Sequence, residues 1–507
     1  MSKHVLTASL YGIHARPVRV ETSYSSGLTR CTVVGLPDTE IKEAKERVHG
    51  ACKSSGLPFP RGRVTINLAP AVTKKQGSHF DVPIALSVLQ AQGLIAEEKL
   101  KDAMFFGELS LGGDITAIVG TLALTLCAKA EGIKRVYVPK DNVAEATLVK
   151  GVECFSISHV RELVAHLNGE LEWQAEKSSS PPVREMSFST DFAHVRGQEV
   201  VKRALEIAAA GGHNILLNGT PGAGKTMLAR SLPSILPPLS RDEILEVTNI
   251  HSVAGELSPN VPFLTERPFR SPHHSSSAVS IIGGGSWPKP GEVSLAHRGI
   301  LFLDEFPEFP RSVLEHLRQP LEDGEVTIAR ALGTVRFPAR FMLVAAMNPC
   351  PCGFATDSTR ECTCTPQQII HYNKKMSGPL LDRIDLYVSV PRVETDKLTS
   401  EDLAEPSCEV QKRVTQARKI QTKRFSHSTA HTNSEMPVHV LKRHAELNPE
   451  GQQLIKAAID KYHLSARSYT RVLKLARTIA DLANEKNISV AHLSEALQYR
   501  PQTHLGY

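Results

Sequence analysis

One stretch decides the fold: Asn214-Ile215-Leu216-Leu217-Asn218-Gly219-Thr220-Pro221-Gly222-Ala223-Gly224-Lys225-Thr226. Its first five residues form an apolar run typical of a buried strand, and the last eight fit the pattern G-x-x-x-x-G-K-[ST]. Glycines in such a loop allow successive backbone N–H groups to surround a phosphate. Lys225 can bridge the β- and γ-phosphates of ATP, and the Thr226 hydroxyl can bind Mg²⁺. We therefore predict a nucleotide-binding phosphate loop at residues 219–226.

A second apolar strand ends in two acids. It reads Gly299-Ile300-Leu301-Phe302-Leu303-Asp304-Glu305, and an uninterrupted apolar strand is typical of a parallel sheet covered by helices on both faces. At its carboxyl end Asp304 can hold Mg²⁺, and Glu305 can polarise a water for attack on the γ-phosphate. On its own such an acidic pair is usually a solvated turn. Together with the phosphate loop, it predicts an ATP-hydrolysing site.

Two further segments supply polar groups for that site. The strand Phe341–Met347 leads into Asn348, which we interpret as a sensor of the γ-phosphate and of the attacking water. The later segment Ser377-Gly378-Pro379-Leu380-Leu381-Asp382-Arg383-Ile384-Asp385 places an arginine where it can stabilise charge on phosphate from a neighbouring subunit. A surface ion pair is the alternative for an arginine between two acids. Its order after both motifs favours the catalytic interpretation.

These segments, together with Met347–Gly353 and Ser465–Leu482, resemble the magnesium-chelatase-like AAA+ ATPases and, within them, the bacterial ComM/YifB proteins. The resemblance implies a homo-hexameric motor that uses ATP and Mg²⁺ and promotes branch migration on DNA in homologous recombination and natural transformation. It also implies that Arg383 acts in trans and that Arg467 is a second sensor on a helical lid. Arg471, one helical turn further along, competes with Arg467 for that role.

The expected fold is an α/β AAA+ P-loop core with a C-terminal helical lid, preceded by an α+β domain. We place the first domain at residues 1–170, a Ser/Pro-rich linker at 171–188, the core at 189–395, and a linker with the lid at 396–507. Helical periodicity over Gly451–Tyr462, Ala466–Asn484 and Val490–Tyr499 predicts the lid, which we expect to close over the nucleotide.

The first domain contains the runs Phe106–Ile115 and Gly132–Pro139, which are similar to the catalytic fold of Lon proteases. Proteolysis of that kind requires a serine activated by a lysine amine, and the chain has Ser78 but carries Leu122 where the family lysine is expected. Lys74 and Lys75 are the remaining amines nearby, and we expect them at a solvated or phosphate-facing edge. The domain is therefore predicted to be non-proteolytic and to serve assembly or DNA contact.

Four of the nine cysteines form a cluster, Cys350-Pro351-Cys352 and Cys362-Thr363-Cys364. Four thiolates can close tetrahedrally around Zn²⁺ and would leave no position open for chemistry, so a zinc ion there would be structural. The one-residue spacing is less common than C-x-x-C, and a cysteine-rich loop without metal is the alternative. The other cysteines are scattered, as reduced thiols are.

DNA contact is predicted in two places. More residues separate the phosphate loop from the acidic strand than one helix and one strand require, and the resemblance implies that this insertion, which contains Lys289, projects toward a ring pore; a flexible surface loop is the alternative. A hairpin is predicted on both sides of Leu332-Gly333, with Arg330 near its tip and Arg336 on the returning strand. Arginines and lysines there would contact phosphates without reading sequence, unless they are simply solvated.

Composition sets the remaining limits. The 507 residues carry a net charge of +6, which is compatible with a polyanionic partner but too diluted to identify one. The sequence contains no apolar run long enough for a membrane helix, and its start lacks the pattern of a signal peptide, so we expect a soluble cytoplasmic protein. The alternative function is a chelatase-type ATPase that remodels a protein partner.

Overall fold

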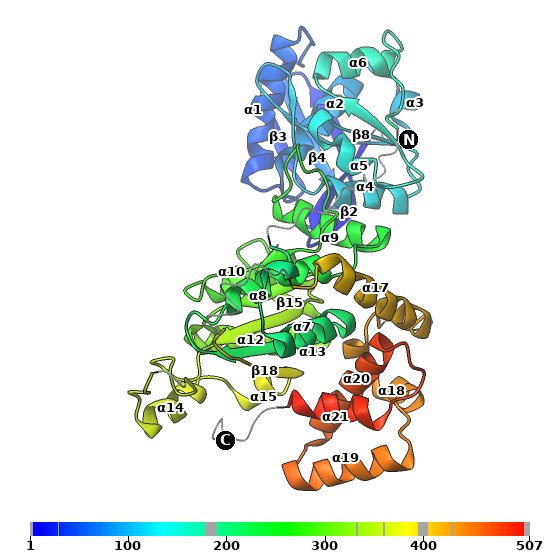
Figure 1. The fold of residues 1–507 in the computed structure, drawn as a ribbon. Helices are drawn as coiled ribbons and strands as arrows, with labels where there is room; N and C mark the ends of the chain where they lie inside the picture. The colour runs from blue at the N-terminus through cyan, green and yellow to red at the C-terminus, as the bar shows by residue number, and fades with distance from the viewer. Residues whose placement is uncertain are drawn as a thin grey trace.

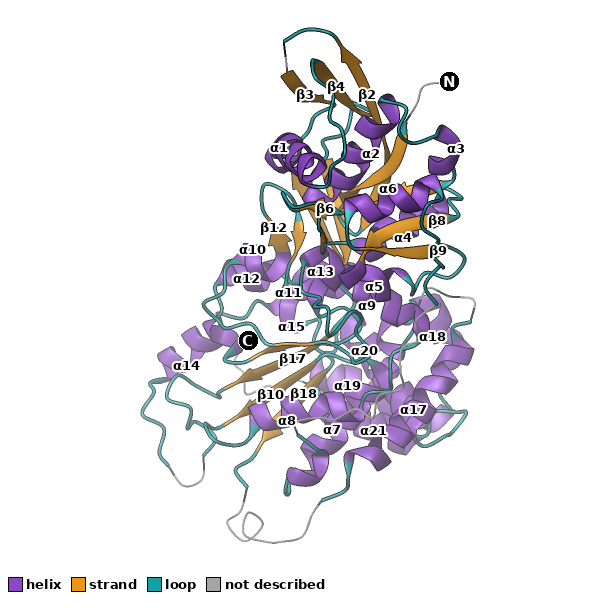
Figure 2. Cartoon of the chain, turned by 90° about the horizontal axis from the view of Figure 1, so that it is seen from above, coloured by secondary structure: helices purple, strands orange, loops and turns teal. Residues whose placement is uncertain are grey.

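This computed structural model describes residues 4–28, 30–177, 190–330, 333–357, 360–393, 404–426, 428 and 430–500. Three regions follow one another along an elongated molecule: an N-terminal region in blue and cyan, a central region in green and yellow, and a helical region in orange and red (Figure 1). The N-terminal and central regions each contain one large sheet, and helices flank both of these sheets (Figure 2). Residues 178–189, which hold most of the predicted Ser/Pro-rich linker, and residues 396–403 of the second linker lie outside the described residues.

The N-terminal region is built on a seven-stranded sheet of order β3-β4-β2-β1-β5-β8-β9. Its strands are β1 Val5–Tyr11, β2 His14–Ser25, β3 Arg30–Val34, β4 Arg63–Ala69, β5 Ala103–Phe105, β8 Arg135–Pro139 and β9 Glu153–Ile157. Its helices are α1 Thr39–Ser54, α2 Asp81–Ala91, α3 Glu97–Leu100, α4 Thr121–Ala130, α5 Val143–Ala146 and α6 Val160–Asn168, and a short hairpin joins β6 Glu108–Leu109 to β7 Ile115–Thr116. The mixture of helix and strand agrees with the prediction. Four of the six strand pairings are parallel, however, so helices and strands alternate rather than segregate as in an α+β domain.

The central region contains a five-stranded parallel sheet of order β11-β14-β17-β10-β18. The strands are β11 Phe269–Arg270, β14 Ile300–Leu303, β17 Met342–Met347, β10 Ile215–Gly219 and β18 Leu386–Val390. Side chains alternate between the faces of a strand, so Leu217 and Phe302 enter one core while Leu216 and Leu303 enter another. Because helices cover both cores, nearly every residue of these strands is apolar, which is the pattern that the sequence showed.

Helices surround this sheet. They are α7 Glu199–Gly211, α8 Lys225–Ser231, α9 Arg241–Ala254, α11 Glu292–Leu295, α12 Arg311–His316, α13 Arg318–Asp323, α14 Pro366–Asn373 and α15 Gly378–Leu381. Ser240 and Glu243 form a capping box that starts α9, and Thr365 with Gln368 does the same for α14. Among the described residues, no helix combines the length and the apolar character that a membrane crossing requires.

Two small hairpins accompany the central sheet. The predicted insertion forms α10 Ala278–Ile282 and a hairpin of β12 Gly283–Gly284 with β13 Lys289–Pro290, so much of it is ordered rather than a featureless loop. The other hairpin pairs β15 Glu325–Arg330 with β16 Gly333–Pro338, as predicted; residues 331 and 332 of its turn lie outside the description. The β1–β2 turn of the N-terminal region contacts the hairpin, since the Tyr11 hydroxyl donates to the Thr334 carbonyl over 3.2 Å.

The C-terminal region contains five described helices: α17 Ser407–Arg424, α18 Val438–His444, α19 Pro449–Tyr462, α20 Ala466–Leu482 and α21 Val490–Gln498. Helix α20 begins where the Ser465 side chain accepts from the Ser468 N–H, and its apolar face joins the same core as α7. An ion pair between Arg203 of α7 and Glu495 of α21, with atoms 2.9 Å apart, ties this bundle to the central region.

Candidate active site

The phosphate loop connects β10 to α8. Gly222 and Gly224 have φ angles of 78° and 85°, a left-handed conformation that side-chain-bearing residues rarely adopt, which explains the two glycines of the motif. The Lys225 ammonium is folded onto its own loop, donating to the carbonyls of Gly219 and Thr220 over 2.6 and 3.0 Å. Burial lowers the pKa of Lys225, and the charge of Asp304 opposes that shift. The loop thus holds the Lys225 ammonium through its own carbonyl groups.

The strand order brings the predicted residues together. Strand β17 lies between β10 and β14, so Asn348 at its end sits between the phosphate loop and the acidic pair. Asn348 Oδ1 accepts from Lys225 Nζ over 3.0 Å, and Thr226 Oγ1 donates to Asp304 Oδ2 over 2.8 Å. Two oxygens this close can coordinate one Mg²⁺, which prefers oxygen ligands, so Thr226 and Asp304 fit the predicted metal. In a parallel sheet the carboxyl ends of all strands lie along one edge, and the candidate site lies at this carboxyl edge.

Glu305 has a partner that the sequence analysis did not identify. Its backbone is left-handed, with φ 51°, and its side chain is 56% exposed. The Nδ1 atom of His274, from the segment that leads into α10, lies 3.0 Å from Glu305 Oε2. The His274 ring also lies against His273 and edge-on to Phe309. The carboxylate expected to polarise water is therefore held by the insertion.

Asn348 is connected to the cysteine cluster through the chain that follows it. Cys350 comes two residues later and is buried. Gly353 lies against the phosphate loop, because a Cβ at that position would be 2.6 Å from Pro221 Cγ and Cδ. The cysteine loop and the phosphate loop are thus in direct contact, and a shift of one displaces the other.

The cluster has the dimensions of a metal site. The Sγ–Sγ separations are 3.3 Å for Cys350–Cys352, 3.7 Å for Cys350–Cys362 and 3.6 Å for Cys352–Cys362, and Cys364 Sγ accepts from the Cys352 N–H over 3.4 Å. All four sulfur atoms lie within 4.8 Å of one another. A tetrahedral Zn²⁺ with Zn–S bonds of about 2.3 Å places its sulfurs roughly 3.8 Å apart. The four cysteines therefore fit a structural zinc ion.

Gln198 is a second residue that the sequence gave no reason to select. It precedes α7 in a left-handed conformation, and its Nε2 donates to the Ala223 carbonyl over 2.8 Å and to the Pro391 carbonyl over 3.0 Å. This amide joins the phosphate loop to the end of β18. A lone glutamine before a helix has no sequence signature, so only the packing identifies it.

Arg383 lies at the opposite end of the strands, where they begin, which we call the amino edge of the sheet. It precedes β18, whose first residue pairs with the first residue of β10, whereas the phosphate loop follows the last residue of β10. The five-residue β10 separates the two edges by about 16 Å. Arg383 donates to the Pro379 carbonyl and pairs with Glu322 of α13, and its Nε atom is buried without a partner among the described residues. Arg383 is therefore placed away from the phosphate loop of its own chain.

The helical region differs from the expected lid. Arg471 donates to the Ile384 carbonyl and lies 3.4 Å from Asp382, and Arg467 lies 3.9 Å from Glu322. Both arginines of α20 therefore gather beside Arg383 at the amino edge, instead of closing over the nucleotide loop. The reason is packing: α17 and α20 bury their apolar faces against α7, which leads into the amino end of β10. Arg467 therefore lies away from the phosphate loop of its own chain, and its role as the second sensor stays a prediction.

The three residues predicted to contact DNA do not share one environment. The exposed Arg330 is next to the insertion hairpin, since a Cβ on Gly284 would lie 3.5 Å from Arg330 Nη2, and Lys289 is the strand partner of Gly284. Arg336 is 70% exposed but pairs with Glu325 across the hairpin over 3.4 Å. Arg330 and Lys289 thus converge on one surface, whereas Arg336 is partly neutralised.

The N-terminal serine has no amine partner among the described residues. The Ser78 hydroxyl donates to the Glu108 carboxylate, and Leu122 is fully buried. Lys75 is also fully buried and donates to the carbonyls of Gly35 and Pro70, so the expectation of a solvated or phosphate-facing edge is wrong for Lys75 and holds only for the exposed Lys74. Burial lowers the pKa of Lys75, but its ammonium is occupied by carbonyl oxygens.

Comparison with protein families matches most of the chain. The model of "Magnesium chelatase, subunit ChlI" matches residues 191–398, that of "Subunit ChlI of Mg-chelatase" matches residues 20–142, and that of "Magnesium chelatase, subunit ChlI C-terminal" matches residues 404–500. The three matches correspond to the central, N-terminal and helical regions of the structure.

Individual relatives align over the whole length. The competence protein ComM of Haemophilus influenzae is 41% identical over 99% of this chain and 98% of its own length. The YifB protein of Escherichia coli is 40% identical over 98% of this chain and 96% of its own length. The magnesium-chelatase 38 kDa subunit of Rhodobacter capsulatus is 28% identical over 31% of this chain and 50% of its own length.

Proposed function

The chain belongs to the magnesium chelatase subunit ChlI family, in its ComM/YifB-type group, and from this premise we propose that it is an ATP-driven DNA motor. In this proposal the chain forms a homo-hexamer and promotes branch migration in homologous recombination and natural transformation. The observation that carries it is the cluster of Lys225, Thr226, Asp304 and Asn348 at one edge of the sheet. Glu305 follows Asp304 after the end of β14, and its backbone N–H donates to Asp304 Oδ1.

The proposed reaction assigns one task to each side chain. Lys225 leaves its loop carbonyls to contact the β- and γ-phosphates, and Thr226 and Asp304 hold Mg²⁺, which neutralises phosphate charge. Glu305 polarises the attacking water, and Asn348 senses the γ-phosphate. Arg383 acts on the nucleotide of a neighbouring subunit, because the length of β10 separates it from its own. Arg467 lies beside Arg383, which supports the same trans role for the second sensor.

We propose that the hairpins transmit this reaction to DNA. Arg330 and Lys289 carry positive charge at the meeting point of two hairpins, and the insertion that bears Lys289 also carries His274, the partner of Glu305. A phosphate contact at the hairpins can therefore change the position of the insertion, and with it the catalytic carboxylate. Contacts of this kind are independent of base sequence and weaken with salt.

Two accessory features complete the proposal. A zinc ion held by Cys350, Cys352, Cys362 and Cys364 would fix the loop that carries Asn348. The N-terminal region would serve as a non-proteolytic, Lon-like domain used for assembly or DNA contact. The occupied Lys75, the buried Leu122 and the contact of Tyr11 with the β15–β16 hairpin support that role.

The deciding experiment measures ATP hydrolysis by the full chain with no DNA, single-stranded DNA and a branched junction, at moderate and high salt. We expect DNA to stimulate turnover, the branched junction most of all, and high salt to remove the stimulation. Arg330→Ala is expected to weaken DNA binding and to reduce the salt slope by about one, while Arg336→Ala, whose arginine already has a carboxylate partner, is the matched control.

The second candidate function is remodelling of a protein partner, as a chelatase-type motor. The similarity to the 38 kDa magnesium-chelatase subunit favours it. Turnover that is the same with every DNA would replace the DNA proposal with this one.

A further inference from the structure

A cavity of about 420 Å³ lies at the amino edge of the central sheet, away from the phosphate loop. Its floor is formed by the first residues of the strands, including Asn214 and Met342, and its walls come from α13 and from the helical region. Six guanidinium or ammonium side chains line it: Arg267, Arg298, Arg340, Arg383, Arg418 and Lys474. The cavity is thus a junction between the core and the helical bundle.

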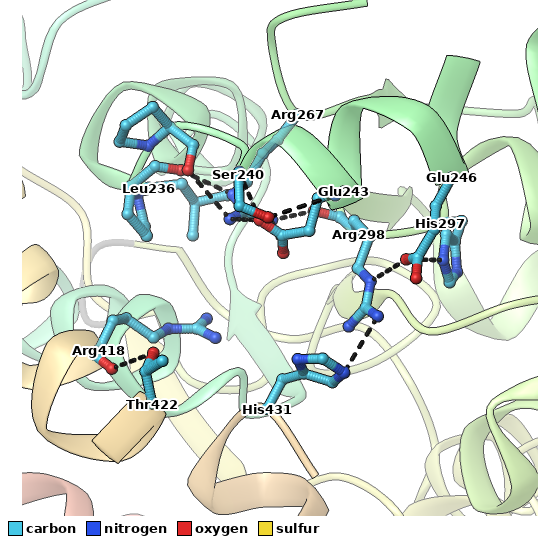
Figure 3. Close-up of polar contacts among 12 residues, drawn as sticks. Leu236, Ser240, Glu243, Glu246, Arg267, His297, Arg298, Arg418, Thr422 and His431 are labelled. Carbon is cyan, nitrogen blue, oxygen red and sulfur yellow. Dashed lines mark hydrogen bonds and ion pairs between the residues drawn. The ribbon is translucent and has the colours of Figure 1, made fainter. Parts of the chain in front are cut away.

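Four of these cations have carboxylate partners, and two of the pairs are Arg340 with Glu435 and Arg383 with Glu322. Arg267 pairs with Glu243 over 3.2 Å and donates to the Pro237 carbonyl over 2.7 Å. Arg298, 9% exposed, donates from Nε to Glu246 over 2.8 Å, and its Nη2 lies 3.2 Å from His431 Nε2. In Figure 3 the side chains of Arg267, Arg298, Arg418 and His431 surround one common space.

Arg418 and Lys474 differ from the others. Neither has a carboxylate oxygen within ion-pair distance among the described residues. Arg418 donates from both Nε and Nη2 to one acceptor, the Ala209 carbonyl, over 3.1 and 2.7 Å, and Lys474 Nζ donates to the Ser434 carbonyl over 2.7 Å. Burial lowers the pKa of Arg418 to about 10, the neighbouring charge of Arg267 acting in the same direction. Carboxylates act on both groups from a longer range, Glu243 and Glu435 on Arg418 and Asp385 and Glu435 on Lys474. Neither group forms an ion pair within the described part of the chain, so both can bind an added anion.

The size of the cavity and its lining residues restrict which anions it can bind. The cavity is larger than a single phosphate requires and falls within the usual range for small-molecule sites. The apolar side chains of Leu321 and Phe341 also line it. So do five carboxylates, three of which pair with arginines of the lining: Glu243, Glu322, Asp323, Asp385 and Glu435. Guanidinium groups suit phosphate oxygens, a carboxylate suits hydroxyl or amino groups, and a phenyl ring suits a flat base.

We propose that this cavity is a second ligand site, which binds the phosphate of a nucleotide-sized anion through Arg418, Lys474 and Arg298. Arg298 precedes β14 of the core, whereas Arg418 and Lys474 belong to α17 and α20 of the helical region. A ligand held by all three fastens the bundle to the core. Because α20 also carries Arg467, occupancy of the cavity fixes the arginine edge of the subunit. The inference does not depend on the DNA proposal.

The test uses the full-length Lys225→Ala variant, so that the phosphate loop does not mask the second site. Isothermal titration calorimetry with ATP, AMP, inorganic phosphate and a short single-stranded DNA measures what remains. We expect one site per chain for the nucleotides and weaker, competing binding of inorganic phosphate. Adding Arg418→Met or Lys474→Met is expected to weaken nucleotide binding at least about tenfold, whereas Lys419→Met, which removes an exposed lysine of the same helix, leaves it unchanged.

Thermal unfolding separates a ligand site from a purely structural arginine. Nucleotide is expected to raise the melting temperature of the Lys225→Ala variant and not that of the double variant with Arg418→Met. Without ligand, Arg418→Met is expected to keep or raise the melting temperature, because it removes a desolvated cation that forms no ion pair with the described residues. Absence of nucleotide binding in Lys225→Ala, binding unaffected by both Met variants, or binding of the oligonucleotide alone would each overturn the proposal. Failure of DNA to stimulate ATP turnover by the wild-type chain would instead count against the motor proposal and not against the second site.

Discussion

The two edges of the central sheet differ in what one chain supplies. At the carboxyl edge, the ends of β10, β14 and β17 bring Lys225 within hydrogen-bonding distance of Asn348, and Thr226 within hydrogen-bonding distance of Asp304. At the amino edge, Arg383, Arg467 and Arg471 gather around Glu322 and Asp382, about one strand length from any phosphate at the loop of the same chain. This separation is the basis of the proposal that the arginines of one chain act on the nucleotide of a neighbouring chain.

Removal of Lys225 tests the first edge and has the largest expected effect. Lys225→Ala deletes the ammonium that contacts the phosphates, so we expect nucleotide binding at the loop to be lost and turnover to fall by at least about 10³-fold. Phosphate release under saturating ATP measures the loss. Lys74→Ala, at an exposed lysine of the N-terminal region, should leave turnover unchanged. Normal turnover in Lys225→Ala would remove the assignment of this edge.

Removal of Arg383 tests the second edge. Arg383→Ala is expected to lower turnover by about 10³-fold while ATP still binds, because the lost group acts on a neighbour's nucleotide. Mixing this variant with Lys225→Ala should restore part of the activity, since mixed assemblies contain some interfaces with both an intact loop and an intact arginine. If mixtures stay inactive although the chains assemble together, the two edges do not cooperate between subunits.

Removal of the proposed zinc ion is a further test of the carboxyl edge. Cys352→Ser is expected to remove about one zinc ion per chain and to lower turnover about ten- to a hundredfold, since the cysteine loop places Asn348 and contacts Pro221. Elemental analysis of the purified protein and a turnover assay measure both effects. Cys408→Ser, at an exposed cysteine outside the cluster, is the control. Absence of zinc from the unmodified chain would return the loop to the metal-free interpretation.

The roles of Arg467 and Arg471 in α20 can be distinguished by the free energy of unfolding of their variants. Arg471 is 15% exposed and holds the Ile384 carbonyl, so Arg471→Ala should lower the free energy of unfolding by about 1–3 kcal/mol. Arg467 is 63% exposed, and Arg467→Ala should leave stability unchanged while reducing turnover several-fold. Chemical denaturation and turnover measurements distinguish the two. The opposite pattern would make Arg471 the second sensor.

The smallest expected effect concerns the partner of Glu305. An exposed ion pair of this kind is worth up to about 1 kcal/mol, so His274→Ala should raise turnover without DNA by no more than about fivefold, because the carboxylate is released from the insertion. The stimulation by DNA should shrink by the same factor. His273→Ala, at the neighbouring residue, is the control. A fall in basal turnover would mean that His274 supports Glu305 instead of restraining it.

Much of this fold followed from local patterns. Phe302 and Leu303 belong to an uninterrupted apolar run, and only a parallel sheet covered on both faces buries such a strand. The glycines at 222 and 224 are required by their left-handed backbone, and the hairpin around residues 331 and 332 followed from alternating side chains. The order of the motifs favoured action of Arg383 on a neighbouring subunit, and the resemblance implies the same trans role.

Other features depended on contacts between distant segments. His274 and Glu305, or Gln198 and Ala223, have no spacing rule that would pair them. The sequence did not predict which surface the helical bundle packs on, because the periodicity of α20 shows which face is apolar but not which surface that face meets.

The sequence by itself determined the chemistry of the nucleotide edge, since a phosphate loop and an acidic strand end are local patterns whose backbone geometry depends on neighbouring residues. Tertiary structure alone decided that Arg383, Arg467 and Arg471 share one edge with the cavity at Arg418, because burial of α17 and α20 against α7 fixes that arrangement. Hydrophobic burial is not directional and depends on the total area removed from water. Its outcome therefore has to be observed in the folded chain.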